Sequence, residues 1–227
     1  MTTDAAPFST FAFGTYRTPE ERRARGKAAR DALPRKAQAN WAPDPQRPDP
    51  IALLEEQEQT RVPALLPLRH ERMGVSAFTF YRGTAIIMAS DLGAQPSSGL
   101  EVQLCGDCHL GNFGFYASPE WHLLFDINDF DETVRGPFEW DLKRLVASAV
   151  LAARALQLNS EQQARAARRT ARAYRKAMQQ LAAQPLQPVW GQRLDADTYI
   201  QRVEHPPLKR HLDKVGAKAR SRTHSEA

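Results

Sequence analysis

The sequence of 227 residues is poor in cysteine and has no long apolar run. Its two cysteines, Cys105 and Cys108, are too few to form the disulfide framework of a small secreted domain. No apolar stretch approaches the roughly 20 residues that span a bilayer. The N-terminal residues also lack the basic and apolar regions of a secretory signal. We therefore expect a cytoplasmic protein that has no membrane partner.

Aromatic residues are sparse as well, at 8%, although the chain carries a net charge of +5. The basic surplus lies in residues 160–227, where 14 basic side chains occur with 6 acidic ones. Proteins that bind nucleic acid usually interleave aromatic residues with basic ones, but among the arginines of residues 165–176 the one aromatic, Tyr174, falls on the opposite helical face. We expect a solvated helix face and no nucleic-acid partner; a basic nucleic-acid-binding protein is kept as an alternative function.

What the sequence does contain is a series of helix signals around a short region rich in strand formers. The order of these signals predicts an α+β fold dominated by helix, with one small sheet. The predicted segments are a disordered start at 1–17, a helical segment at 18–74 with a proline-rich connector at 41–50, a core at 75–215 with strands near 102–105, 113–116 and 121–127, and a basic tail at 216–227.

The sequence also predicts where some of the helices begin or end. Thr18-Pro-Glu-Glu is a typical helix start, and Pro34 ends that helix. The apolar spacing of residues 76–92 predicts one longer helix. Gly136-Pro137 is predicted to open a buried helix, and one weak helix is expected around Tyr199.

The residues that carry chemistry follow the first predicted strand. Asp107 and Asn112 have the D-x-x-x-x-N spacing of a kinase catalytic loop, in which the aspartate accepts the proton of the substrate hydroxyl and the asparagine binds Mg²⁺. A predicted hairpin then brings further acids, among them Asp126 and Asp129. Because Mg²⁺ prefers oxygen ligands, the pattern predicts a metal site formed by Asn112 with Asp129 or Asp126.

The run Gly106-Asp107-x-His109-x-Gly111-Asn112 resembles the catalytic loop of aminoglycoside phosphotransferases and choline-kinase-like enzymes. In those families an acidic hairpin segment precedes a second aspartate by twelve residues, which is the separation of Asp129 from Asp141. The resemblance therefore ranks Asp129 before Asp126 as the metal carboxylate. It implies a kinase-like catalytic lobe.

The chain also resembles the bacterial domain-of-unknown-function 2252 family. The runs that carry this resemblance are Arg72-Met73, Phe78-x-Phe-Tyr-Arg82-Gly83, Met88-Ala-x-Asp91-Leu92, Gln103-x-Cys-Gly-Asp-x-His-Leu-Gly-Asn112, Phe125-Asp-x-Asn-Asp-Phe-Asp-Glu132 and Glu139-Trp-Asp-Leu-Lys-Arg-Leu145. Together the two resemblances imply Mg²⁺- and ATP-dependent phosphoryl transfer, with a nucleotide and a small-molecule or protein hydroxyl as partners.

The sequence lacks two parts of a kinase, a G-x-G-x-x-G loop and a lysine-bearing strand before the catalytic loop. The family resemblance therefore implies a truncated or partial member. An inactive member that acts as a binding protein is a second interpretation.

The two cysteines allow other interpretations. Cys105-x-x-Cys108-His109 matches a haem-attachment pattern, which needs export, and zinc would need further ligands such as His109 and His122. Two inert, buried thiols are the preferred interpretation, because free cysteine packs as a small hydrophobe.

Several roles remain open at this level. His109 is assigned to the catalytic loop, either orienting it or acting directly. Arg82 and Asp141 are assigned to cofactor binding, but Arg82 could pair with an acid, and Asp141 could brace the loop or cap a helix. Asp131 and Glu132 could belong to the site or to a solvated turn.

Overall fold

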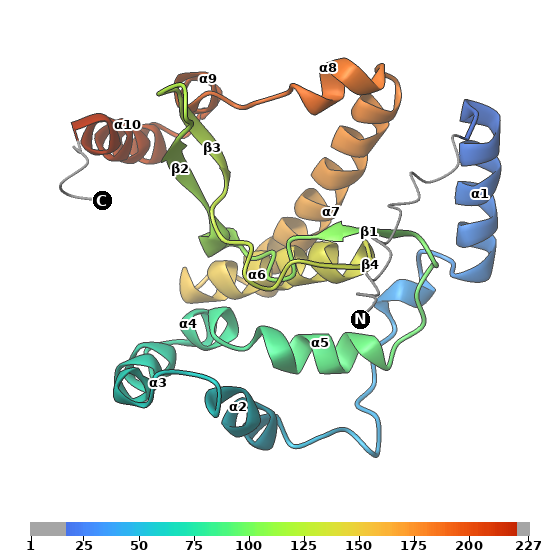
Figure 1. Ribbon diagram of the computed structural model, residues 1–227, viewed down its shortest axis with the longest axis vertical. Helices are drawn as coiled ribbons and strands as arrows, with labels where there is room; N and C mark the ends of the chain where they lie inside the picture. The colour runs from blue at the N-terminus through green and yellow to red at the C-terminus, as the bar shows by residue number, and fades with distance from the viewer. Residues whose placement is uncertain (1–16, 222–227) are drawn as a thin grey trace, which may run out of the picture. The chain divides into compact units, whose positions relative to one another are not determined.

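The computed structural model describes residues 17–221, and Figure 1 traces them from the N- to the C-terminus. The predicted disorder of residues 1–16 and the last residues of the predicted tail, 222–227, lie outside the described residues. Two compact units divide the chain after Trp41. The first contains helix α1 (Pro19–Ala32) and the 3-10 turn η1 (Ala37–Ala39). α1 begins as predicted, with a capping box between Thr18 and Glu21.

The second unit is mostly helical, which confirms the α+β, helix-dominated prediction. Its helices are α2 (Pro50–Glu58), α3 (Leu66–Gly74), α4 (Ala77–Arg82), α5 (Ala85–Gly93), α6 (Glu139–Ala155), α7 (Ser160–Ala182), α8 (Leu186–Trp190), α9 (Ala196–Gln201) and α10 (Pro206–Ser221), with 3-10 turns η2 (Pro63–Leu65) and η3 (Leu110–Asn112). α10 includes residues 216–221, which the sequence had suggested belonged to a tail. No helix in residues 17–221 is both long and apolar enough to cross a membrane.

The strands form two separate antiparallel pairs instead of one sheet. β2 (Phe113–Ala117) and β3 (Leu123–Ile127) make the predicted hairpin, with Phe115 opposite Phe125. β1 (Glu101–Leu104) pairs with β4 (Val134–Pro137), a strand that the sequence did not predict. Pro137 is therefore the last residue of a strand, and the prediction that it opens a helix is wrong, because α6 begins at Glu139.

The predicted single helix over residues 76–92 is also wrong, because the chain breaks between α4 and α5. Gly83 ends α4, and Thr84 is buried between the helices. A Cβ atom at Gly83 would lie 2.7 Å from the sulfur of Met73. The missing side chain thus lets the end of α4 pack closely against α3, and that packing overrides the helical spacing of the apolar residues.

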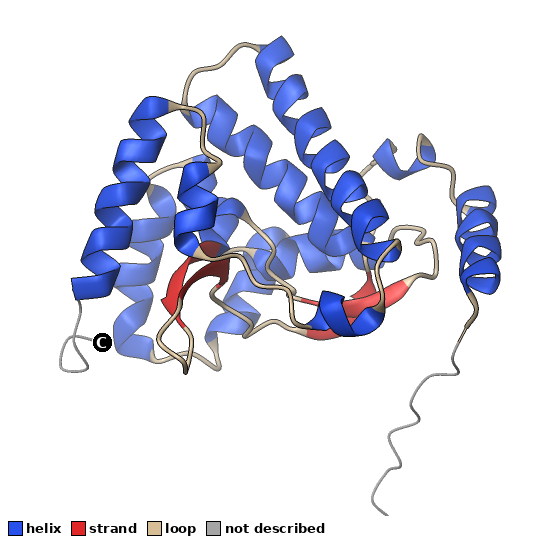
Figure 2. Ribbon diagram, turned by 90° about the horizontal axis from the view of Figure 1, so that it is seen from above, coloured by secondary structure: helices blue, strands red, loops and turns tan. Residues whose placement is uncertain are grey.

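α6 is the central helix of this unit, and it packs against α4, α5 and α7 (Figure 1). Figure 2 shows the helices in blue and the short strands in red. Besides two alanines, its buried residues are polar: Glu139, Arg144 and Ser148 are each less than 4% exposed. Buried polar groups are unfavourable unless they form hydrogen bonds. Each of these buried polar side chains is therefore expected to have a partner from another segment of the chain.

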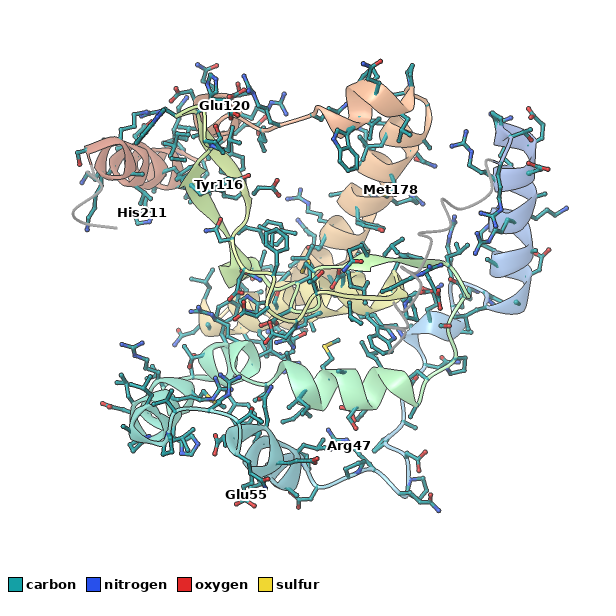
Figure 3. The ribbon with its side chains drawn as sticks, viewed as in Figure 1. Arg47, Glu55, Tyr116, Glu120, Met178 and His211 are labelled. Carbon is teal, nitrogen blue, oxygen red and sulfur yellow. The ribbon has the colours of Figure 1, made fainter. Side chains whose placement is uncertain are left out.

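Helices α9 and α10 pack on the β2–β3 hairpin (Figure 1). The ring of Tyr199 from α9 stacks on Phe125 with 3.9 Å between ring centroids. The amide of Phe125 also donates to the carbonyl of Leu194 over 2.8 Å. Figure 3 shows Glu120 at the tip of this hairpin and His211 on α10. The hairpin thus joins the C-terminal helices to the loop at its other end.

Candidate functional site

The loop between β1 and η3 carries most of the predicted site residues, and its shape depends on Gly106. Gly106 has φ +88°, a conformation that side chains disfavour. A Cβ atom there would lie 1.9 Å from the carbonyl oxygen of Glu132. Glycine therefore lets this loop lie against the segment that follows the hairpin, which brings the two predicted acidic regions together.

Asp141 holds the start of the same loop from the first turn of α6. Its carboxylate accepts hydrogen bonds from the backbone amides of Cys105, at 2.8 Å, and Gly106, at 3.1 Å. Asp141 does not line the cleft described below. This geometry corresponds to the alternative in which Asp141 braces the loop.

Asp107 forms an ion pair with Arg144, a residue of α6 that is 2% exposed. On its other carboxylate oxygen it lies 3.4 Å from Nε2 of His109. Burial alone would raise the pKa of Asp107, but the hydrogen bond from His109 and the charge of Arg144 outweigh burial and lower that pKa below its usual range. Asp107 is therefore held as a carboxylate.

Arg144 is held in turn by Tyr81 of α4. The guanidinium lies 4.4 Å from the centre of the Tyr81 ring and donates to the Tyr81 carbonyl over 2.9 Å. The Tyr81 hydroxyl donates to the carbonyl of Arg144, also over 2.9 Å. Burial raises the pKa of Tyr81 to about 12, so the hydroxyl remains a donor.

Asn112 joins the loop to the segment after the hairpin. Its side-chain Nδ2 donates to the carbonyl of Asp107, at 3.2 Å, and to that of Asp129, at 3.1 Å. Since both partners are acceptors, the NH₂ end of the amide must face them. The amide oxygen is then the end that remains for another ligand.

Of the two alternative metal carboxylates, Asp129 lines the cleft with Asp107 and Asn112, and Asp126 does not. Asp126 lies on β3 and accepts from the amide of the next residue, Ile127, over 2.8 Å. The nearby Glu132 is half-buried, and its pKa is raised by burial and by the charges of Asp107 and Asp129. A raised carboxyl pKa is expected where negative charges gather, and a bound cation would relieve it.

His109 is 5% exposed, and its Nε2 faces Asp107 while its Nδ1 is buried without a hydrogen-bond partner in the described chain. The following amide, that of Leu110, donates to the buried hydroxyl of Ser148 over 3.1 Å. The loop is therefore anchored to α6 at both ends, by Asp141 and by Ser148.

Asp107, His109, Asn112 and Asp129 form one side of a cleft of about 740 Å³. We call these four residues the loop wall. The other side consists of η2, α3, α4 and the turn before them. It carries four arginines, which we call the arginine wall: Arg61, Arg69, Arg72 and Arg82.

The arginine wall lacks neutralising partners. Among residues 17–221 none of its four side chains forms an ion pair with a carboxylate. Arg69 donates to the carbonyl of Gly83 over 2.5 Å, but its Nε is buried without a partner in the described chain. Burial, and then the charge of Arg61, lower the pKa of Arg69. The predicted alternative that Arg82 pairs with an acid is not observed.

The cysteines lie behind the loop. Cys105 and Cys108 are buried free thiols, and with Asp141 they form a cluster whose ligand atoms lie within 4.8 Å of one another. The neighbouring thiol and burial raise the pKa of Cys105 far above its usual range, so the thiol stays protonated. This cluster has soft sulfur ligands and does not suit Mg²⁺, whereas Asp107, Asn112 and Asp129 bring hard oxygen atoms to the cleft.

The geometry can be set beside known families. Residues 61–227 match the family described as uncharacterized proteins conserved in bacteria, DUF2252. The chain belongs to this family. Neither the curated proteins nor the solved structures gave a match.

The DUF2252 match includes nearly the whole cleft. It begins at Arg61, the first residue of the arginine wall, and Thr60 is the one lining residue before it. The loop wall and the arginine wall therefore both belong to the family domain.

Sequence reasoning missed most of the arginine wall. Arg69 and Arg72 stand three residues apart, a spacing that puts them on one face of a helix. That spacing was a usable signal. The position of this face opposite Asp107 depends on the packing of α3 and α4, and it could not be deduced from periodicity.

Proposed function

We propose that the protein is a kinase-like phosphotransferase that moves a phosphoryl group from Mg-ATP to a hydroxyl acceptor. The observation that carries this proposal is the loop wall. Asp107 and Asn112 from the loop, and Asp129 from the segment after the hairpin, line one cleft. Phosphoryl transfer needs few covalent steps from the protein, because positioning and charge stabilisation supply most of the rate.

The metal assignment rests on the ligand chemistry of the cleft. The amide oxygen of Asn112 and the exposed carboxylate of Asp129 are hard oxygen donors. Burial, and then the charges of Asp107 and Asp129, raise the pKa of Glu132 beside them. One or two carboxylates with phosphate oxygens are the usual surroundings of Mg²⁺ in proteins. Bound there, Mg²⁺ would neutralise charge on the phosphates.

Asp107 then has the role of orienting the acceptor. Its carboxylate is held by Arg144 and His109, so it presents a fixed acceptor for a hydroxyl proton. As the new bond from the hydroxyl oxygen to the phosphorus forms, the bond to the β-phosphate oxygen breaks, ADP leaves, and the proton passes to Asp107. His109 keeps the carboxylate in place.

The same ion pair supports a second candidate, a family member that binds ligand without turnover. A carboxylate with a lowered pKa is a weaker base, and both oxygens of Asp107 already have partners. The two candidates share the metal–nucleotide site and differ in the chemical step.

The experiment is a thermal unfolding series with Mg-ATP on the whole chain, comparing wild type, Asp129→Asn and Asp126→Asn. A ligand at about 100 times its Kd should stabilise the wild type by about 2.7 kcal/mol. Because Asp129 lines the cleft and Asp126 does not, we expect Asp129→Asn to lose the Mg²⁺-dependent part of the shift and Asp126→Asn to keep it.

Asp107→Asn in the same series separates the two candidates. A phosphotransferase should lose its slow hydrolysis of ATP, with water as the acceptor, and keep the Mg-ATP shift. Binding in the wild type without any hydrolysis would favour the binding protein. Equal shifts in Asp129→Asn and wild type would refute the metal assignment, and no shift in the wild type would refute both candidates.

A further inference from the structure

The arginine wall is a concentration of positive charge without an internal partner. Arg61, Arg72 and Arg82 are exposed, and no carboxylate of the described residues lies within ion-pair distance of any of the four arginines. Arg47 and Arg144 pair with Asp91 and Asp107, whereas exposed arginines such as Arg168 form no ion pair in the described chain either. What sets the four arginines of the wall apart is that they line one cleft. Glu58 and Glu132 act on Arg69 only from beyond ion-pair distance, so an anion that enters the cleft could contact the guanidinium groups directly.

The orientation of the wall is fixed by its backbone. Arg69 and Arg72 share one face of α3, and Arg69 is tied to the end of α4 by its bond to the Gly83 carbonyl. Arg82 lies over the catalytic loop, since a Cβ atom at Gly111 would be 3.1 Å from its Nε. Arg69 is thus fixed in place and Arg82 lies against the loop, while Arg61 and Arg72 line the same cleft.

The size and chemistry of the cleft indicate the anion. A volume of about 740 Å³ lies within the range of about 300–1,000 Å³ that is usual for small-molecule sites, and it is more than one phosphate needs. Guanidinium groups bind phosphate oxygens through paired hydrogen bonds. No lysine lines the cleft within the described residues, so the four arginines are its permanent cations.

We propose that the arginine wall binds the triphosphate chain of the donor nucleotide and does the work that a glycine-rich loop and a lysine do in kinases. This inference rests on the proposed phosphotransferase function. The phosphates would lie between two walls of opposite charge. Arginine on one side would neutralise the chain, and the acidic residues of the loop wall would face its terminal phosphate.

The test is calorimetric titration of the full chain with inorganic tripolyphosphate, orthophosphate and ATP, each without Mg²⁺. We expect tripolyphosphate to bind more tightly than orthophosphate, because it can reach several arginines at once. The variants Arg72→Gln and Arg82→Gln each remove one exposed charge from the wall. We expect each to weaken tripolyphosphate binding about tenfold, the loss of one charge-assisted contact.

Two variants serve as controls. Arg168→Gln removes an exposed arginine of α7 that does not line the cleft, and it should leave binding unchanged. Asp129→Asn removes a negative charge from the opposite wall, so tripolyphosphate without Mg²⁺ should bind at least as tightly. Equal weakening in Arg168→Gln and Arg72→Gln would mean nonspecific charge attraction and would overturn the inference.

The outcomes also distinguish this inference from the proposed function. If Arg72→Gln and Arg82→Gln leave Mg²⁺-dependent ATP hydrolysis unchanged, the inference that the arginine wall binds the triphosphate is refuted. The proposed phosphotransferase activity would still be supported by that result. If tripolyphosphate binding depends on these arginines but no ATP is hydrolysed, the phosphate-binding role of the arginine wall is supported and the phosphotransferase activity is contradicted. Tighter binding of a single-stranded oligonucleotide than of tripolyphosphate, lost in the same variants, would assign the wall to nucleic acid instead.

Discussion

The two walls of the cleft differ in how their charges are held. On the loop wall the Asp107 carboxylate has partners on both oxygens, and its guanidinium partner, Arg144, is buried under Tyr81. On the arginine wall the charged groups have no carboxylate within reach in residues 17–221. Charges that are already paired set the geometry of a site, whereas charges without partners are available to a ligand. Arg144 is paired and buried behind the cleft, whereas the arginines of the wall line it without ion pairs in residues 17–221.

The largest expected effect comes from comparing Arg144→Gln with Arg72→Gln. Removing Arg144 leaves Asp107 buried without its countercharge, which should lower the free energy of unfolding by about 3–5 kcal/mol. Arg72 is exposed and unpaired, so its replacement should change stability by no more than about 0.5 kcal/mol. Urea denaturation of both variants measures the difference. Similar losses in the two would contradict the division between a structural and a ligand-binding arginine.

A smaller effect is expected when alanine replaces either of two glycines, Gly106 beside the loop wall and Gly74 beside the arginine wall. In Gly106→Ala the new Cβ meets the Glu132 carbonyl at a positive φ, and we expect a loss of about 2–4 kcal/mol from overpacking and backbone strain. Gly74→Ala, at the end of α3, meets no atom within 4 Å, and alanine there should be neutral or stabilise by up to about 1 kcal/mol. Thermal unfolding of the two variants measures this difference in stability. If Gly106→Ala is as stable as the wild type, the loop does not lie in close contact with the segment after the hairpin.

The smallest effect is a difference in pH dependence. Because the pKa of Asp107 is lowered in the folded protein, the unfolded chain binds more protons near and below pH 4, and the stability from this carboxylate is lost as pH falls through that range. The free energy of unfolding should therefore fall less steeply in Asp107→Asn than in wild type between about pH 5 and pH 2. Arg72→Gln removes no group that titrates there and should keep the wild-type slope. Identical slopes in all three proteins would show that Asp107 is not held by its partners.

The sequence predicted the loop wall better than the arginine wall, and the reason is local. Asp107 and Asn112 lie five residues apart in one loop, and Asp129 follows one hairpin, so short-range spacing was enough to bring them together. The sequence also predicted the helix-dominated fold class, the β2–β3 hairpin and the capping of α1, because each of these depends on residues that are neighbours in the sequence.

The features that the sequence did not predict depend on packing between distant segments. β4 was missed because Val134 to Pro137 become a strand only through pairing with β1. The break at Gly83 follows from the close approach of Met73, and the arginine wall faces Asp107 because α4 packs on α6. Pro137 at the end of a strand and Pro19 at the start of a helix show that the same residue type gives either outcome, according to its partners.

The stack of Tyr199 on Phe125 has a consequence for the order in which the protein is made. Asp129 follows a hairpin whose covering helices come roughly 70 residues later in the chain, and a ribosome adds about 5–20 residues each second. For several seconds of translation the aromatic rings of β2 and β3 are therefore bare while the loop of Asp107 has already emerged. Over that interval the nascent chain exposes an uncovered β-hairpin, the kind of surface that chaperones shield and neighbouring chains capture.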